Sequence, residues 1–380
     1  MKKITTRQVI IFYCLYSFSI KFLALPSLLS VHAGRDAWIA AAIGTVLELA
    51  MIFLVLNVLV AGRNSDIYSD MRRNTTMVGA KAFILMMLAV LLLQIFILAA
   101  QSYNLLNEHL FDEVNIHKFL VPLMLMGILF CFMPARAIFR SGEVYWLLII
   151  VALVLAVGPA LMQVRPAEAT PVLSRGVNPV FNAIFRNLIY FESAALLLVF
   201  SGDIKIEKDF RKKFMTAATL VGVFFVLFVL MCTMLFGPLA PLKSTAIAGV
   251  TIYSSFLTQG GRLDWLLICV WLLLLLLRFG VAFFCAFASL RYVFNLKHRA
   301  GYIGFGIATV VYPLFVWVFK GADGVNDFVG LFGIAIAVAI LFFLIPILSF
   351  LNSLIPLSKK QIEKVKSKLP PSEVKEGKND

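Results

Sequence analysis

Residues 9–30, VIIFYCLYSFSIKFLALPSLLS, are the stretch that decides the fold. At a rise of about 1.5 Å per residue, this apolar run is long enough to cross a hydrocarbon core of about 30 Å. Lys21 lies inside it, where a charge costs about 2.5–3.5 kcal/mol on insertion scales. Pro26 lacks a backbone donor, so we expect a distorted helix between Lys21 and Ser30. A charge beside a distorted helix at membrane depth indicates backbone that lines a cavity or is packed in protein; the alternative is a lysine that snorkels to the headgroups.

The composition indicates a membrane protein built from several spans. Of the 380 residues, 61% are hydrophobic and 14% are charged, and 35 are phenylalanine. Chains this apolar are typical of polytopic membrane proteins. The net charge of +14 does not indicate a nucleic-acid partner, because most lysines and arginines fall in alternate loops and in the tails. This positive-inside bias predicts cytoplasmic N- and C-termini. The five cysteines all fall within predicted spans and form no CxxC pair, so we expect neither a disulfide framework nor a metal site.

The hydropathy pattern predicts ten membrane spans and no soluble domain. The spans are expected at about 9–30, 37–61, 81–106, 118–133, 145–162, 180–201, 214–236, 265–290, 302–318 and 328–354. A segment of the longest external loop, residues 245–259, is predicted to be a short helix at the membrane interface. The lysine-rich tail, residues 357–380, is expected to be disordered in isolation. Since no interval can hold a soluble domain of about 50 residues, we expect a single transmembrane domain over residues 1–380.

The residue types argue against an enzyme. All four histidines lie in predicted loops, and the chain contains neither an HExxH motif nor a P-loop. No serine or cysteine in a span has a histidine in another span, as an intramembrane nucleophile would require. Residues Gly301–Gly306 resemble a glycine-rich phosphate loop but lack its strand context, so close helix packing explains them better. We therefore predict no catalytic residue, no cofactor and no metal.

Ionisable residues at membrane depth are the candidates for a functional site; they are Lys21, Glu48, Arg186, Glu192 and Arg278. If the ten spans form two halves of five, the first and sixth spans correspond and run in opposite directions. Lys21 lies in one of them and Glu192 in the other. Charged or interrupted helices at matching places of inverted halves indicate a transporter-type site at the midplane. We expect Lys21 and Glu192 to face one another, with Arg278 as the second choice of partner for Glu192. The alternative is an ion pair that only holds the halves together.

The remaining polar residues have simpler interpretations. We expect Glu48 to serve packing or hydrogen bonding, with a role in the site as the alternative. Arg186 lies near the outer end of its span and can snorkel. Gln94 and Gln101 are seven residues apart and so share one face of the third span. Interhelical hydrogen bonding is their expected use, with ligand contact second.

Several local motifs of this chain have a family likeness. They are Gln8, Leu25–Ser27, the turn Ala33–Trp38, Tyr190–Glu192 and the turn Gly261–Trp265. These motifs resemble those of the endospore germination permeases, the B subunits of germinant receptors. The likeness covers nearly the whole chain, and the Gly-Arg-Asp-Ala-Trp turn is its most specific part. Lys21 is a departure, because related amino-acid permeases usually keep small residues before the Leu-Pro pair.

The resemblance implies the fold of the amino acid–polyamine–organocation superfamily, an all-α inverted repeat of five plus five helices. The repeats would cover about 7–162 and 180–354, with the first and sixth helices interrupted. It also implies a multi-pass protein of a bacterial spore's inner membrane, acting with a membrane A subunit and a lipid-anchored C subunit. The implied site for a small germinant, such as an amino acid, comprises Lys21, Phe22, Leu25, Pro26, Gln94, Tyr190, Phe191, Glu192 and Arg278. A lysine in this site would fill the place of a ligand carboxylate or meet an acidic ligand.

Three functions stay open at this point. The chain can be a receptor subunit that binds a germinant between the first, third, sixth and eighth spans. It can be a secondary amino-acid transporter, with proton coupling through Glu192 or Glu48. It can also be a structural scaffold with an empty pocket, which would show no saturable binding of any ligand.

Overall fold

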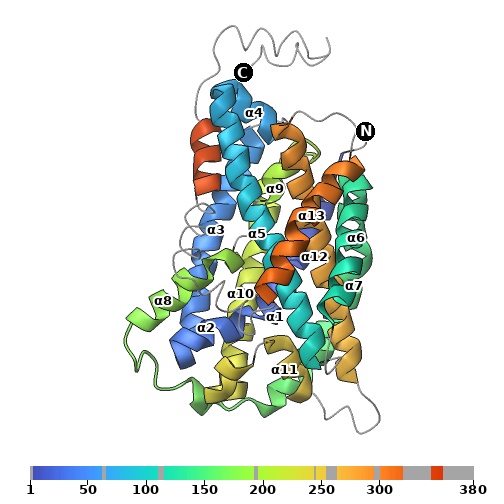
Figure 1. The fold of residues 1–380 in the computed structure, drawn as a ribbon. Helices are drawn as coiled ribbons and strands as arrows, with labels where there is room; N and C mark the ends of the chain where they lie inside the picture. Colours follow the sequence, from blue (N-terminus) through green and yellow to red (C-terminus); the bar gives the residue numbers. More distant parts are fainter. Residues whose placement is uncertain are drawn as a thin grey trace, which may run out of the picture.

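The computed structural model describes residues 3–61, 66–109, 115–191, 196–243, 245–253, 263–294, 300–319 and 344–353, and these are almost entirely helical (Figure 1). The α-helices are α1 (Thr6–Leu23), α2 (Leu25–Ala33), α3 (Ala37–Ala61), α4 (Ile67–Asn74), α5 (Met77–His109), α6 (Ile116–Phe132), α7 (Ala135–Ala160), α8 (Asn178–Asn187), α9 (Leu196–Val199), α10 (Phe210–Phe236), α11 (Ala246–Tyr253), α12 (Leu263–Val293) and α13 (Ala300–Phe319). Short 3-10 helices are η1 (Gly34–Asp36), η2 (Leu161–Gln163), η3 (Pro166–Ala169), η4 (Leu188–Phe191) and η5 (Gly237–Leu242). A last apolar helix covers Leu344–Ser353.

The apolar helices make this a polytopic membrane protein. Within the described ranges, six segments are long and apolar enough to cross a membrane, and three shorter apolar helices accompany them. Seven of the first nine predicted spans each coincide with one helix; the first combines α1 and α2, and the described part of the sixth combines α8, η4 and α9. Of the tenth predicted span, only residues 344–353 are described. The tail at 357–380 and residues 254–259 of the predicted interface segment lie outside the described residues.

The first span is interrupted where the sequence predicts it. Helix α1 ends at Leu23, Ala24 takes φ −116° and ψ −32°, and α2 begins at Leu25 with Pro26 in its first turn. Proline is well accommodated there because the first turn of a helix needs no donor. The carbonyl of Phe22, which would normally accept a bond from residue 26, cannot do so. The predicted distortion between Lys21 and Ser30 is therefore confirmed, and it leaves backbone polar groups inside the bundle.

The sixth span also loses its α-helical form, although it contains neither proline nor glycine. Helix α8 ends at Asn187, and the 3-10 turn η4 continues the chain to Phe191. The buried amide of Asn187 donates to the carbonyl oxygen of Ala183 at 2.9 Å. Asparagine side chains that bond to the backbone compete with helical hydrogen bonds, which favours an end to the helix at this point. After residues outside the described ranges, α9 begins at Leu196.

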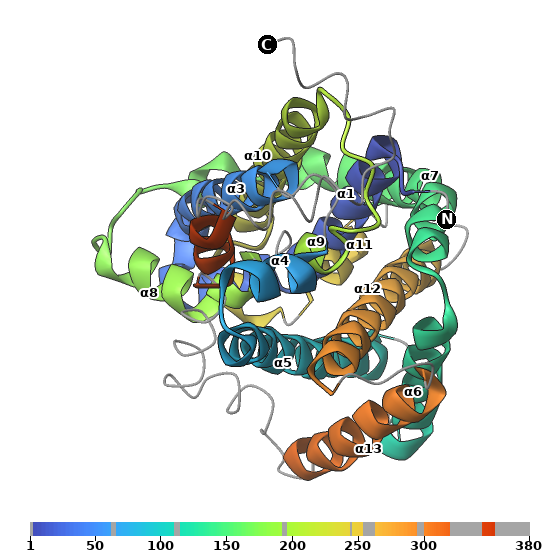
Figure 2. The same cartoon turned by 90° about the horizontal axis from the view of Figure 1, so that it is seen from above.

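The helices pack in pairs that join the two halves of the chain. Helix α2 packs on α8, α3 on α10, α5 on α12 and α6 on α13 (Figure 2). Each pair combines one of the first four spans with the span five places further along the chain. The most extensive of these contacts is between α5 and α12, and α12 also contacts α1.

The Ala33–Trp38 turn fastens the first two spans to the connection between the fifth and sixth. Gly34 ends α2 at φ +58° and ψ −124°, a conformation that side chains with a Cβ rarely adopt. The guanidinium of Arg35 donates to the carbonyl of Thr170 at 2.7 Å, and Asp36 accepts the backbone N–H of Leu173 at 2.8 Å. The motif is thus explained by a structural role: it fixes the loop that bridges the two halves.

The short helix predicted at the membrane interface is buried among other helices. Helix α11 packs on α7, α12 and α1, and Ala246, Ile247, Ala248 and Val250 are at most 5% exposed. The predicted helix is confirmed for the described part of the segment, which packs inside the bundle, and its depth relative to the membrane stays a prediction. The segment AIAGV has no polar face to turn toward water, so apolar neighbours on all sides suit it better.

Reciprocal glycine–phenylalanine contacts hold α6 against α12. A Cβ added at Gly280 of α12 would lie 2.6 Å from the ring of Phe130, and one added at Gly127 of α6 would lie 2.8 Å from the ring of Phe283. Each helix thus offers a glycine and, three residues later, a phenylalanine that fits the glycine of the other. Close packing of this kind drives helix association in lipid, where apolar burial alone gives little.

We expect Gly280→Ala to destabilise the protein by about 1–3 kcal/mol, because the new methyl group overlaps the Phe130 ring. The measurement is the thermal unfolding temperature of the detergent-solubilised chain. Gly306→Ala in α13 is the matched control, since a Cβ there meets nothing within 4 Å. Adding Phe130→Leu to Gly280→Ala should restore part of the loss. Equal unfolding temperatures for the two alanine variants would contradict the packing described.

Candidate functional site

A buried ion pair lies just before the interruption of the first span. The ammonium of Lys21 in α1 bonds to the carboxylate of Glu48 in α3, and their side chains are only 2% and 4% exposed. Removing two charges from solvent is costly, so the pair depends on its mutual attraction. The ring centroid of Phe191 in η4 lies 5.8 Å from the Lys21 ammonium, within the range of a cation–π contact.

The approach of Phe191 depends on Gly44, which lies one turn from Glu48 on α3. A Cβ at Gly44 would lie only 2.3 Å from the Phe191 ring. The absence of a side chain therefore lets the sixth span reach the ion pair. In this way three elements, α1, α3 and η4, meet around one pair of charges.

The observed partner of Lys21 differs from the residue that the sequence favoured. Glu192 lies outside the described residues, so a contact between Lys21 and Glu192 stays a prediction. The snorkelling alternative for Lys21 is wrong, because the residue is 1% exposed inside the bundle. Glu48, for which packing or hydrogen bonding was the expected use, carries a charge-pairing role.

A second polar group joins α12 to α1. The guanidinium of Arg278 donates to the carbonyl oxygen of Tyr16 at 2.8 Å and to the hydroxyl of Ser19 at 3.3 Å. It also lies 4.0 Å from the centroid of the Tyr16 ring. The hydroxyl of Tyr16 in turn donates to the side-chain oxygen of Gln94 in α5 at 3.3 Å. A permanent cation of the eighth span thus holds the first span close to its interruption.

A small cavity lies at this network, where the first, third, sixth and eighth spans meet. It is lined by Ile20, Gln94, Ile97, Leu98, Ile189, Tyr190 and Arg278. Its volume is about 10 Å³, room for about one water molecule. Tyr190 is hydrogen-bonded to Gln101, so Gln94 and Gln101 bond to different helices from the same face of α5. The predicted interhelical use of these two glutamines is confirmed.

The described members of the predicted site fall into four groups. Gln94, Tyr190 and Arg278 line the cavity, and Lys21 and Phe191 belong to the adjacent ion-pair cluster. Phe22 packs on Phe224, Phe225 and Phe228 of α10, with ring centroids 5.5, 5.7 and 4.8 Å away. Leu25 and Pro26 are buried and form the interruption itself. Arg186 bonds within α8, to Asn182 at 3.0 Å.

Sequence reasoning missed the contribution of α1 to the cavity and its network. Tyr16, Ser19 and Ile20 lie three and four residues apart and so share one helix face. Two of the three are polar residues in an otherwise apolar span, a pattern that indicates partners inside the bundle. That pattern, read together with Arg278, was the available signal.

The site offers groups suited to molecular recognition. A fixed guanidinium beside a tyrosine hydroxyl and two amides suits a small polar or anionic molecule. In the described part of the chain, no group of three or more histidine, cysteine, aspartate or glutamate side chains is arranged to hold a metal ion. The chemistry available is hydrogen bonding and charge pairing at membrane depth.

Fold and site together define a polytopic helical membrane protein whose interrupted first and sixth spans meet at a buried polar centre. The chain belongs to the spore germination protein family, Spore_permease, whose profile matches residues 3–324. This confirms the resemblance and places the chain among membrane receptors and transporters, not among enzymes. A search of curated proteins gives no significant match.

We expect Lys21→Met alone and Glu48→Leu alone each to cost about 3–5 kcal/mol, because each leaves one buried charge without its partner. The double variant should be more stable than either single variant, since no charge remains. Folded yield and unfolding temperature after gel filtration measure the effect. As control, Glu168→Gln breaks the half-exposed pair with Arg35 and should change stability by at most about 1 kcal/mol. A double variant whose loss equals the sum of the single losses would show that the two charges are not coupled.

Proposed function

We propose that the chain is the ligand-recognising subunit of a spore nutrient receptor, and that a small germinant such as an amino acid binds where α1, α5, η4 and α12 meet. The observation that carries the proposal is the cavity lined by Gln94, Tyr190 and Arg278, placed beside the interruptions of two spans. Interrupted helices at membrane depth are tolerated only where protein or a cavity receives their backbone groups. A guanidinium with neighbouring amide and hydroxyl groups fits a ligand carboxylate.

We also propose that the fold is an inverted repeat of five plus five spans. Its support is the regular pairing of helices, in which each of the first four spans packs on the span five places later. A two-fold axis in the membrane plane produces such pairs, and an odd number of spans per half inverts the orientation. The interruption of both the first and the sixth span fits the same symmetry.

Ligand binding in this arrangement requires the helices around the cavity to separate. The cavity as described holds about one water molecule, far less than an amino acid needs. A carboxylate that takes the Arg278 guanidinium would compete with the carbonyl of Tyr16 and so loosen α12 from α1. A difference of about 2.7 kcal/mol in affinity between the closed and open forms shifts their balance about a hundredfold.

The contacts between the two halves of the chain favour a receptor over a transporter. The Lys21–Glu48 pair lies within the first half of the chain, so it does not tie the two halves together. The hydrogen bond from Arg278 to Tyr16 does connect the two halves, because it joins the eighth span to the first. This tie opposes the free rocking of halves that transport requires, yet a ligand carboxylate can release it. The alternative remains a secondary transporter in which Glu48 carries the coupled proton.

The proposal includes the assembly and the membrane. The chain would lie in the inner membrane of a bacterial spore and act with a membrane A subunit and a lipid-anchored C subunit, as family membership suggests. Both termini would be cytoplasmic, and the support is the distribution of lysine and arginine over alternate loops.

The test measures the thermal unfolding of the purified chain with each of the common L-amino acids, followed by radiolabelled uptake into proteoliposomes. We expect at least one amino acid to raise the unfolding temperature, since a ligand at a hundred times its Kd adds about 2.7 kcal/mol. Arg278→Gln should abolish this shift. Arg291→Gln, on the exposed end of the same helix, should not.

Two outcomes would contradict the proposal. Saturable, concentrative uptake by the chain alone would make it a transporter. A ligand-induced shift that survives in correctly folded Arg278→Gln would place binding elsewhere. Size-exclusion profiles of each variant show whether it is folded.

A further inference from the structure

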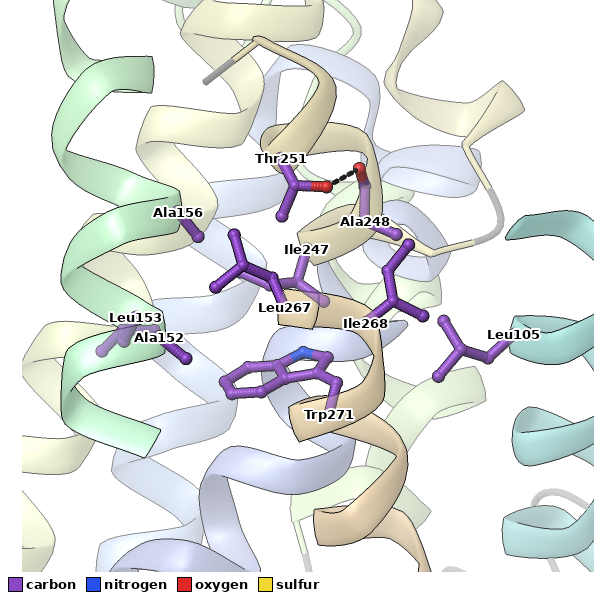
Figure 3. A pocket seen from close by; sticks show the side chains of 10 residues that line it. All are labelled: Leu105, Ala152, Leu153, Ala156, Ile247, Ala248, Thr251, Leu267, Ile268 and Trp271. Carbon is purple, nitrogen blue, oxygen red and sulfur yellow. Dashed lines mark hydrogen bonds between the residues drawn. The ribbon is translucent and has the colours of Figure 1, made fainter. Parts of the chain in front are cut away.

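We propose that the chain has a second small-molecule site, enclosed by α5, α7, α11 and α12, that takes an apolar solute carrying one hydrogen-bond acceptor. The site is separate from the central cavity and does not rest on the proposed receptor function. It is a cavity of about 10 Å³ in the same bundle (Figure 3). Its lining residues are Leu105, Ala152, Leu153, Ala156, Ile247, Ala248, Thr251, Leu267, Ile268 and Trp271.

The lining leaves one hydrogen-bond donor without a partner. Trp271 is 3% exposed, and its indole N–H has no hydrogen-bond acceptor among the described residues. In Figure 3 the nitrogen lies on the edge of the indole turned toward Ile247 and Thr251. The hydroxyl of Thr251 donates to the carbonyl of Ala248 at 2.7 Å, so its proton is directed within α11. A buried donor left unsatisfied is costly, and unlike the indole N–H of Trp38 this one borders a cavity in which an acceptor from outside the chain can lie.

The chemistry of the lining defines the class of ligand. Apart from the Trp271 N–H and the Thr251 hydroxyl, the lining side chains are hydrocarbon, and none is charged. A zwitterion such as an amino acid would lose its hydration here without gaining a charged partner. A small apolar molecule with one hydroxyl or carbonyl oxygen satisfies both the hydrocarbon walls and the indole. The two cavities therefore select different molecules.

The cavity as it stands has room for about one water molecule, so a solute of this class enters only when neighbouring side chains move. Buried waters typically make about three hydrogen bonds, and apolar cavities of proteins stay dry and admit apolar molecules. The walls Ala152, Ala156 and Ala248 are short, so the space is bounded by backbone that a solute can approach closely. Side chains such as Leu267 and Ile268 have to rotate to enlarge it.

The position of α11 gives the site a consequence for the rest of the bundle. Helix α11 is buried and packs on α1 and α2 as well as on α7 and α12. Thr245, at its start, bonds to His109 at the end of α5. A molecule wedged between α7 and α11 would therefore act on the helices that flank the first interruption.

The experiment uses a variant of the full chain in which Trp271 is the sole tryptophan, the other four being replaced by phenylalanine. Its fluorescence is titrated with 2,2,2-tribromoethanol, a heavy-atom quencher with a hydroxyl acceptor, and with bromoform, a quencher without one. We expect saturable quenching by tribromoethanol that Ala156→Leu removes by filling the cavity. The matched control keeps only Trp38, whose indole N–H is likewise buried without a described partner but does not line the cavity. Its quenching should rise linearly.

A second measurement tests the acceptor directly. Isothermal calorimetry on the otherwise unaltered chain compares tribromoethanol with bromoform before and after Trp271→Phe, which keeps the ring and removes the N–H. The preference for tribromoethanol should fall by about two- to tenfold, the worth of one hydrogen bond. Linear quenching of equal slope at Trp271 and Trp38 would overturn the site. Saturable quenching with an unchanged preference in Trp271→Phe would overturn the role of the indole.

Discussion

The contact between Lys21 and Glu48 is the constraint on which the centre of this protein depends. Neither charge can stay at membrane depth alone, so the pair fixes α1 against α3 just before the chain breaks at Ala24. Beside it, Gly44 makes room for the ring of Phe191, which faces the Lys21 ammonium. The interruption of the sixth span is thereby brought to the interruption of the first. The Lys21–Glu48 pair and the absence of a side chain at Gly44 thus bring the interruptions of the first and sixth spans together inside the bundle.

Features of the fold and the site that depend on neighbouring residues could be predicted from the sequence, whereas contacts between distant helices could not. The break at Pro26 is local, because a missing backbone donor acts within one helical turn, and the sequence predicts it correctly. The shared face of Gln94 and Gln101 follows from helix periodicity alone. The partner of Lys21 could not be predicted in this way, because the choice between carboxylates on different helices depends on how those helices pack. The same holds for Arg278, whose observed acceptor is the backbone carbonyl of Tyr16, a group that leaves no trace in a side-chain pattern.

Two polar ties of different kinds act on α1. The Lys21–Glu48 pair belongs to the first half of the chain and lies beside a ring of the sixth span. The Arg278–Tyr16 bond crosses from the second half to the first and ends on a backbone oxygen. Breaking the Lys21–Glu48 pair leaves a buried charge without a partner, and the free-energy cost of that is large. The second tie can be exchanged for another acceptor. A structure with one permanent tie and one exchangeable tie has a stable core and a defined place at which it can open.

In the function proposed above, a ligand carboxylate would exchange with the Tyr16 carbonyl, and this exchange sets a gain against a cost. A hydrogen bond from a charged donor contributes about 1.5–3 kcal/mol, and a carboxylate that replaces the Tyr16 carbonyl forms a stronger, charge-assisted bond with Arg278. Against this gain stand the opening of a cavity that has room for only about one water molecule and the exposure of packed surface around Ile97 and Ile189. These two terms have opposite sign. A ligand that binds the open form more tightly than the closed form would therefore move the population from one to the other.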